Sequence, residues 1–225
     1  MRYDDILKRL KSLANPMAVE GMARYGIRPA KAYGVSIPDL RDIARETGTD
    51  HGLAQRLWEA GIRETQILAS LVDDPKMVTE DQMESWVKDF DSWDTCDQVC
   101  QNLFGVTKSA YQKAIEWSSS NKEFIKRAGF VLMAKLAVSD KTSGDKEFIK
   151  FLSIIKKEST DNRNFVKKAV NWALRQIGKR NVSLNKMAIE TAEEIQQMDS
   201  RSARWIASDA IRELTSEAAQ QRLRG

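Results

Sequence analysis

The sequence predicts an all-α protein, a right-handed solenoid of helical repeats that forms a single domain over residues 1–225. Three observations carry this prediction. The composition favours helix, amphipathic segments of helical period follow one another along the chain, and two of these segments resemble each other at a spacing typical of helical repeats.

Proline is confined to the first third of the chain. The four prolines stand at positions 16, 29, 38 and 75, so the last 150 residues contain none. Proline is the strongest helix breaker, and its absence leaves this long stretch free to form helices. Hydrophobic residues make up 42% of the chain, enough for a buried core, so disorder is not expected.

Thirteen segments have the helical period, and the signals between them mark their ends. Thr79 and Ser183 stand where N-caps are expected, breaks are marked by Gly48, Gly144 and Asn181, and residues 27–37 are expected to form a loop. The predicted helices are 3–13, 17–26, 38–47, 50–60, 62–73, 79–89, 92–104, 108–118, 121–138, 145–158, 163–179, 183–197 and 200–215.

Internal similarity indicates a repeat architecture. Residues 123–128 match residues 164–169 at a spacing of 41, and residues 201–214 align with 168–181 at a spacing of 33. Helical similarity at such spacings is typical of HEAT or armadillo solenoids. The alternative is that amphipathic helices resemble one another without being repeats.

Several function classes lack their signals in this sequence. No apolar run approaches the roughly 18 residues of a membrane span, and residues 1–13 are too charged for a signal peptide, so a cytoplasmic protein is expected. Cys96 and Cys100 are expected in the core, and His51 is the only histidine, which disfavours a metal site. Without a P-loop or GxGxxG motif, no nucleotide cofactor is expected.

The net charge of +4 hides two opposed regions. Residues 73–97 hold nine acidic and two basic side chains, a formal charge of −7, and residues 163–186 hold seven basic side chains and no acid. Local patches steer charged partners more than the total does. Apart from Asp97, the acids of the first region are expected to face solvent.

The basic region coincides with a helix that has two distinct faces. One face is an apolar stripe made of Val166, Val170, Ala173, Leu174 and Ile177. The other face carries Lys168, Trp172, Arg175 and Lys179. An indole among cations suits a nucleic-acid backbone, because the cations contact phosphates and the ring contacts sugar or base. The alternative is that Trp172 packs against the next helical layer.

Residues 200–214 repeat this division, with Ala203, Ile206, Ala210 and Leu214 as the core stripe. The opposite face carries Arg201, Trp205, Ser208 and Arg212, and the same two readings apply to Trp205.

Two further positions stand out on their helix faces. Arg127 lies opposite the apolar residues of 121–138, beside the small residues Val131 and Ala134, where a salt bridge is the commoner role. Trp93 and Asp97 lie one helical turn apart. A carboxylate beside an indole is partly desolvated, and the residues alone leave structure and function equally open for Asp97.

These residues lie in stretches that resemble the HEAT-like-repeat alkylpurine DNA glycosylases, the AlkD superfamily. The matching stretches are residues 22–25, 33–41, 92–97, 126–128 and 166–175, and together they cover most of 17–215. The resemblance implies that Asp97 is the catalytic carboxylate and that Trp93 and Trp172 line the site. It also implies that Tyr25 and Arg127 contact DNA; Ser92 stands where the family has a first tryptophan.

The resemblance further implies hydrolysis of the N-glycosidic bond of cationic purines, such as 3-methyladenine and 7-methylguanine, in double-stranded DNA. Arg127, Lys168, Arg175 and Lys179 would then contact phosphates. A monomer without cofactor, located in the cytoplasm with the nucleoid, fits this reading. Two alternatives stay open: a non-catalytic binder of damaged or branched DNA, which the intact Asp97 disfavours, and a protein-interaction solenoid.

Overall fold

The computed structural model describes residues 1–224, and in this part of the chain every regular element is a helix. The chain forms two compact units, Met1–Ser109 and Ala110–Gly225. The predicted all-α class is confirmed. The single domain over 1–225 stays a prediction.

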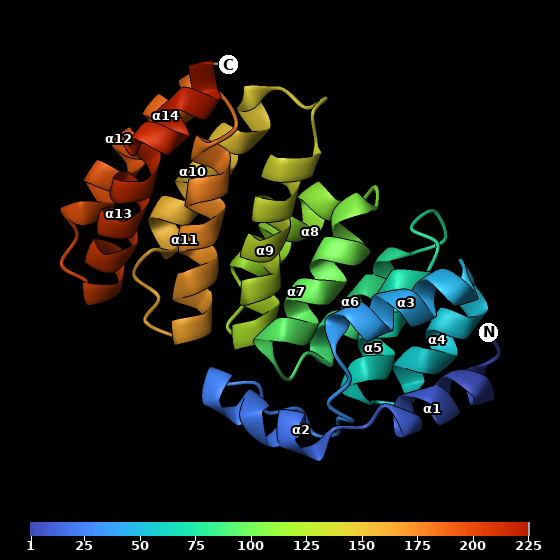
Figure 1. Ribbon diagram of the computed structural model, residues 1–225. Helices are drawn as coiled ribbons and strands as arrows, with labels where there is room; N and C mark the ends of the chain where they lie inside the picture. The colour runs from blue at the N-terminus through green and yellow to red at the C-terminus, as the bar shows by residue number, and fades with distance from the viewer. Residues whose placement is uncertain (225) are drawn as a thin grey trace. The chain divides into compact units, whose positions relative to one another are not determined.

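The first unit contains seven α-helices and two short 3₁₀ turns. Helices α3, α5 and α7 pack side by side, and α4 packs on α5 and on α1 (Figure 1). Trp58 of α4 stacks on Trp86 of α6, with ring centroids 4.0 Å apart and an angle of 4° between the planes. The elements are α1 Tyr3–Ser12, α2 Pro16–Met22, η1 Ala23–Tyr25, α3 Ile37–Thr47, α4 His51–Glu59, α5 Arg63–Val72, α6 Glu80–Lys88, α7 Trp93–Asn102 and η2 Phe104–Val106.

The second unit has two layers of helices (Figure 1). Helices α9, α11 and α13 form one layer, and α8, α10 and α12 form the other, each packed on the next helix of the chain. The bounds are α8 Ala110–Ser118, α9 Glu123–Ser139, α10 Asp145–Glu158, α11 Asn164–Gly178, α12 Val182–Gln196, α13 Arg201–Leu214 and α14 Glu217–Arg224. A β-carbon on Gly129 of α9 would lie 2.5 Å from the Ser118 nitrogen, so glycine permits the close approach of α8 and α9.

Each of the thirteen predicted segments contains a helix, and α14 was not predicted. The predicted cap at Thr79 is confirmed, since its hydroxyl accepts from the Gln82 N–H at 3.1 Å. The predicted cap at Ser183 is wrong. The side chain of Asn181 accepts from the Leu184 N–H at 2.8 Å, so the helix begins earlier and Ser183 lies inside it.

The repeat register differs from the sequence alignment in one place. Helices α9 and α11 begin at 123 and 164, which is the predicted offset of 41. Helices α11 and α13 begin at 164 and 201, an offset of 37 rather than 33. The discrepancy is about one helical turn, because an amphipathic pattern matches itself again after each turn.

Candidate functional site

In the first unit, two of the predicted site residues lie on α7. Trp93 is the first residue of this helix, Asp97 follows one turn later, and both side chains are partly exposed. Cys96, Val99 and Cys100 are fully buried, as predicted, and they fix which face of α7 remains accessible. The carboxylate and the indole therefore share a stripe beside the core.

The indole of Trp93 is held in place by the segment that carries Tyr25. Its Nε1 donates to the backbone oxygen of Tyr25 at 2.9 Å. The Tyr25 side chain itself is 72% exposed, and the N–H of Ala30 donates to the Asp91 carboxylate at 2.9 Å. Trp93 at the start of α7 and Asp91 just before it thus anchor residues 25–30, which places Tyr25 close to Trp93.

The loop between η1 and α3 is further held by a buried carboxylate that no sequence pattern singles out. Glu64 accepts from the N–H groups of Tyr33 at 2.8 Å and Gly34 at 2.9 Å. Gly34 has a φ of +77°, and a β-carbon there would lie 2.3 Å from the Asn15 oxygen. Only glycine fits this turn without strain.

Glu64 belongs to a buried ionic network behind the start of α7. The Arg63 guanidinium donates to Asp94 at 2.6 Å and to Glu64 at 3.1 Å. All three side chains are at most 9% exposed. A buried charge whose partner is removed costs about 3–5 kcal/mol, so this network fixes the position of α7 relative to α5.

The expectation that the other acids of the acidic region face solvent is wrong for two of them, Asp73 and Asp94. Asp73 is 5% exposed and contacts His51 at 2.6 Å and Gln82 at 2.7 Å. Asp94 is buried with Arg63. Asp89 is exposed, as expected, although it accepts from Trp58 Nε1 at 2.8 Å. These carboxylates join elements within the first unit.

In the second unit, several of the predicted site residues lie on α11. The predicted core stripe is confirmed, because Val166, Val170, Ala173, Leu174 and Ile177 are each 0% exposed. On the other side, Lys168 is exposed and Trp172 is half-buried. The predicted separation of an apolar face from a face with cations and an indole is therefore present.

Two of the cations on α11 have a partner that the sequence reading missed. Arg175 and Lys179 both pair with Glu213 of α13, the lysine at 2.6 Å, and Asp209 lies 3.8 Å from Arg175. Burial opposes the ionisation of Glu213, but hydrogen bonds from Lys179 and Arg175 outweigh it, so its pKa lies below the ordinary value. A phosphate at these cations has to compete with this carboxylate.

Helix α13 has the predicted division of its faces. Ala203, Ile206, Ala210 and Leu214 are each 0% exposed. Trp205 is 41% exposed, and the Lys167 ammonium lies 4.8 Å from its ring centroid. The remaining residues of the predicted face, Arg201, Ser208 and Arg212, are exposed, and Arg212 pairs with Asp209.

Arg127 has the least accessible side chain among the predicted site residues. It is 5% exposed and donates from Nη1 to the Phe165 backbone oxygen at 2.6 Å, between α9 and α11. Val131 and Ala134 beside it are buried. A contact between Arg127 and phosphate stays a prediction.

Two classes of site are absent from residues 1–224. No group of three or more His, Cys, Asp or Glu side chains is arranged to hold a metal ion, and no helix is long and apolar enough to cross a membrane.

The paired helical layers define the class of the protein, an all-α repeat protein of the HEAT-like type. A solved structure described as "a new family of proteins related to the HEAT-like repeat DNA glycosylases with affinity for branched DNA structures" has this fold. It aligns with a TM-score of 0.80 and 19% identity over 99% of this chain and 96% of its own. The family model described as DNA alkylation repair enzyme matches residues 6–214, and the chain belongs to this family.

Two curated relatives are bacterial proteins described as uncharacterised. Lin0241 of Listeria innocua is 25% identical over 137 residues, and Lmo0209 of Listeria monocytogenes is 24% identical over 137 residues. Each alignment covers 59% of this chain and 61% of the relative, so the chain spans about three fifths of their length.

Proposed function

We propose that this protein is a DNA glycosylase that hydrolyses the N-glycosidic bond of cationic alkylated purines, of the 3-methyladenine and 7-methylguanine type, in double-stranded DNA. The observation that carries the proposal is the α7 stripe. Asp97 presents a carboxylate one turn from Trp93, whose indole is fixed by the Tyr25 carbonyl. Membership of the DNA alkylation repair enzyme family supports the same chemistry.

The chemistry needs little besides a positioned anion. A purine that carries a positive charge is already a good leaving group, so protonation of the base is not required. As the glycosidic bond breaks, the deoxyribose gains oxocarbenium character, which a fixed carboxylate stabilises electrostatically. We assign this role to Asp97, which would also orient the attacking water.

Aromatic ring faces and cations complete the proposed site. The electron-rich faces of Trp93 and Trp172 favour the developing positive charge on the sugar. Exposed cations hold the backbone on either side of the lesion without reading sequence. The residues assigned to DNA contact are Tyr25, Arg127, Lys168, Arg175, Lys179, Arg201, Trp205 and Arg212.

The decisive experiment measures free methylated purines released from methylated duplex DNA by the wild-type protein and by Asp97→Asn. We expect the variant to lose about 2–4 kcal/mol of transition-state stabilisation, roughly 30- to 1,000-fold in single-turnover rate, while DNA binding changes little. Asp81→Asn is the control, since Asp81 belongs to the same acidic region and is exposed. A wild-type rate in Asp97→Asn would remove Asp97 from its role.

A second candidate is a DNA-structure binder without catalysis. The relative with the same fold is described as having affinity for branched DNA, and Glu213 occupies two cations of α11. This candidate predicts salt-sensitive binding of branched DNA with no base release from any alkylated substrate. A protein-interaction solenoid predicts negligible DNA affinity at moderate salt. Measuring free bases and bound DNA in one incubation separates the three.

We propose further that the protein works as a monomer in the cytoplasm, in association with the nucleoid and without a cofactor. Sedimentation velocity of the free and DNA-bound protein tests the first of these proposals.

A further inference from the structure

The second unit has a hollow of about 730 Å³ between the starts of α11 and α13. Its wall combines an indole, two cations and polar loop residues. Lys167 lies in the first turn of α11, Arg201 and Trp205 lie in the first turns of α13, and Asn162 belongs to the preceding loop. The volume lies within the roughly 300–1,000 Å³ of ordinary small-ligand sites.

Trp205, the aromatic residue that lines the hollow, is accessible to a ligand. Trp205 is 41% exposed, whereas Trp58, Trp86 and Trp117 are at most 5% exposed. The Lys167 ammonium lies 4.8 Å from the Trp205 ring centroid, so this cation is already held beside the indole. A ligand that places a ring against the indole and an anion near the lysine therefore loses less free energy in ordering these two side chains than it would if they were free to move.

The two walls of the hollow are tied together by hydrogen bonds. The Ser202 hydroxyl donates to the Asp161 backbone oxygen at 2.7 Å, which joins the start of α13 to the loop before α11. The Asp161 carboxylate is in turn held by Arg163 and by Lys126 at 3.1 Å. The hollow therefore has a fixed width.

The charge of the lining favours an anion. Lys167 and Arg201 contribute two positive charges, and Asp199 contributes one negative charge at the rim. Asp199 pairs with the Arg204 guanidinium at 3.3 Å, which offsets its charge. A ligand that fits this lining has a planar ring to stack on the indole and a phosphate to contact the two cations.

We propose that this hollow binds an unpaired nucleotide of a DNA strand, with its base against Trp205 and its phosphate between Lys167 and Arg201. The proposal rests on the DNA binding contained in the proposed function, and it gives Trp205 a role distinct from backbone contact. Bases inside a duplex stack on one another and present no free ring face. Only an unpaired base gains from the indole, as in single-strand binding proteins.

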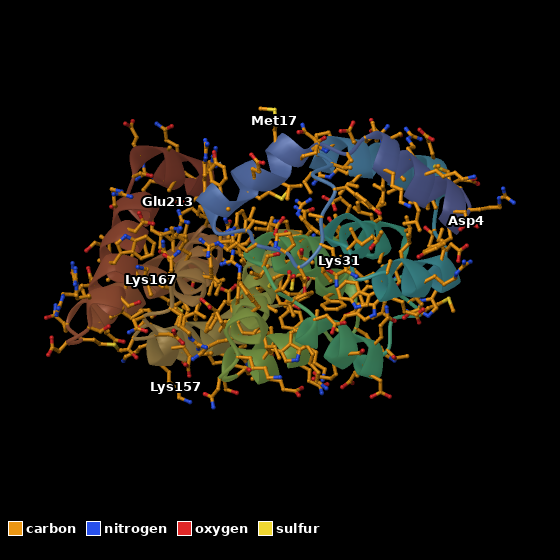
Figure 2. The ribbon with its side chains drawn as sticks, turned by 90° about the horizontal axis from the view of Figure 1, so that it is seen from below. Asp4, Met17, Lys31, Lys157, Lys167 and Glu213 are labelled. Atoms are coloured by element: carbon orange, nitrogen blue, oxygen red, sulfur yellow. The ribbon has the colours of Figure 1, made fainter. Side chains whose placement is uncertain are left out.

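The test compares three DNA probes by fluorescence anisotropy at fixed salt: a blunt duplex, the duplex with a four-nucleotide single-stranded extension, and the same extension built from abasic residues. The variants are Trp205→Ala, Trp205→Phe and Lys167→Ala. Lys157→Ala is the control for loss of one cation, since Lys157 of α10 is 77% exposed and points outward in Figure 2. It is not among the residues that line the hollow.

We expect the natural extension to tighten binding about tenfold over the blunt duplex, a gain typical of one stacked base. Trp205→Ala abolishes the gain and Trp205→Phe keeps part of it. Lys167→Ala reduces the gain, and Lys157→Ala leaves it intact. The ligand could be a free nucleotide or an unpaired nucleotide of a DNA strand, and titration with a deoxynucleoside monophosphate separates the two. Weak or absent binding of the monophosphate supports the DNA strand. Binding as tight as that of the extended duplex overturns the assignment to a strand.

The proposal is overturned if the abasic extension binds as tightly as the natural one, or if Lys157→Ala lowers the gain as much as Lys167→Ala. Base release from methylated DNA, measured on the same preparations, keeps the two proposals apart. If methylated bases are released but the extension does not tighten binding, only the nucleotide site in the hollow is contradicted. If the extension tightens binding but no base is released, only the proposed glycosylase activity is contradicted.

Discussion

Glu213 of α13 holds Lys179 of α11 at 2.6 Å, and the same carboxylate pairs with Arg175. Both cations belong to the face that the sequence assigns to phosphate. A carboxylate of the protein thus stands where an anionic partner is expected to bind.

Replacement of this carboxylate should strengthen DNA binding. Glu213→Gln frees two cations, so we expect a lower Kd at low salt and a steeper dependence of log Kd on log salt, by up to about 0.9 per added phosphate contact. Anisotropy titrations at several salt concentrations measure the slope. Glu193→Gln removes an exposed acid of α12 and serves as control. Equal slopes for Glu213→Gln and wild type would show that removing this carboxylate adds no phosphate contact at these cations.

The buried network behind α7 should dominate the stability of the first unit. Asp94→Ala leaves the Arg63 guanidinium buried without its 2.6 Å partner, so we expect a loss of about 3–5 kcal/mol in the free energy of unfolding. Urea unfolding followed by circular dichroism measures this loss. In the triple variant Arg63→Met, Glu64→Gln and Asp94→Leu, much of the stability should return, because no unpaired buried charge remains. If Asp94→Ala lowers the free energy of unfolding by less than about 1 kcal/mol, the Arg63–Asp94 pair contributes no more than an ordinary surface ion pair.

The turn at Gly34 should tolerate no side chain. Gly34→Ala forces a β-carbon to 2.3 Å from the Asn15 oxygen at a φ of +77°, and we expect at least about 1–3 kcal/mol of destabilisation. Gly21→Ala is the matched control, since that position in α2 has open space and alanine favours helix by about 0.5–1 kcal/mol. Thermal melts of both variants measure the difference. Equal melting temperatures would contradict the constraint.

Acid should destabilise the second unit through Asp161. Burial opposes its ionisation, but hydrogen bonds from Arg163 and Lys126 outweigh it and lower its pKa from 3.8 to about 2. A carboxylate with a lowered folded-state pKa contributes stability above its unfolded value, and this is lost as the pH falls from about 4 to about 2. The contribution is about 2 kcal/mol.

Urea unfolding at pH values between these limits checks the contribution of Asp161. In Asp161→Asn the stability at neutral pH should be lower and the acid dependence weaker. Asp199→Asn, at an exposed site, should match wild type. An unchanged acid dependence in Asp161→Asn would assign the effect to other carboxylates.

Helix positions and buried faces were predictable because they depend on local patterns. The core residues of α11 and α13 recur at the helical period, and proline and capping residues mark the ends. Helix α14 lacked this signal: only Ala219 of its residues is buried, so it has almost no apolar stripe. The same periodicity misled the register of α13 by one turn, since it repeats within a helix as well as between helices.

Ionic partners were not predictable, because they join residues far apart in sequence. Glu213 pairs with Arg175 across an offset of 38 and Asp94 pairs with Arg63 across 31, and no local pattern connects them. The formal charges counted over residues 73–97 and 163–186 consequently overstate the charge that these two regions present to a partner. The roles of Asp97, Trp93 and Trp172 stay predictions that base release has to test.

The stacked indoles of Trp58 and Trp86 give the first unit an optical label of its own. Both rings are buried and in parallel contact, whereas the second unit contains the exposed indole of Trp205. Unfolding of the first unit should separate the stacked pair and shift its emission to longer wavelength. Quenching by a water-soluble agent should act first on Trp205. A single fluorescence experiment without added dye can therefore follow the integrity of one unit and the occupancy of the other.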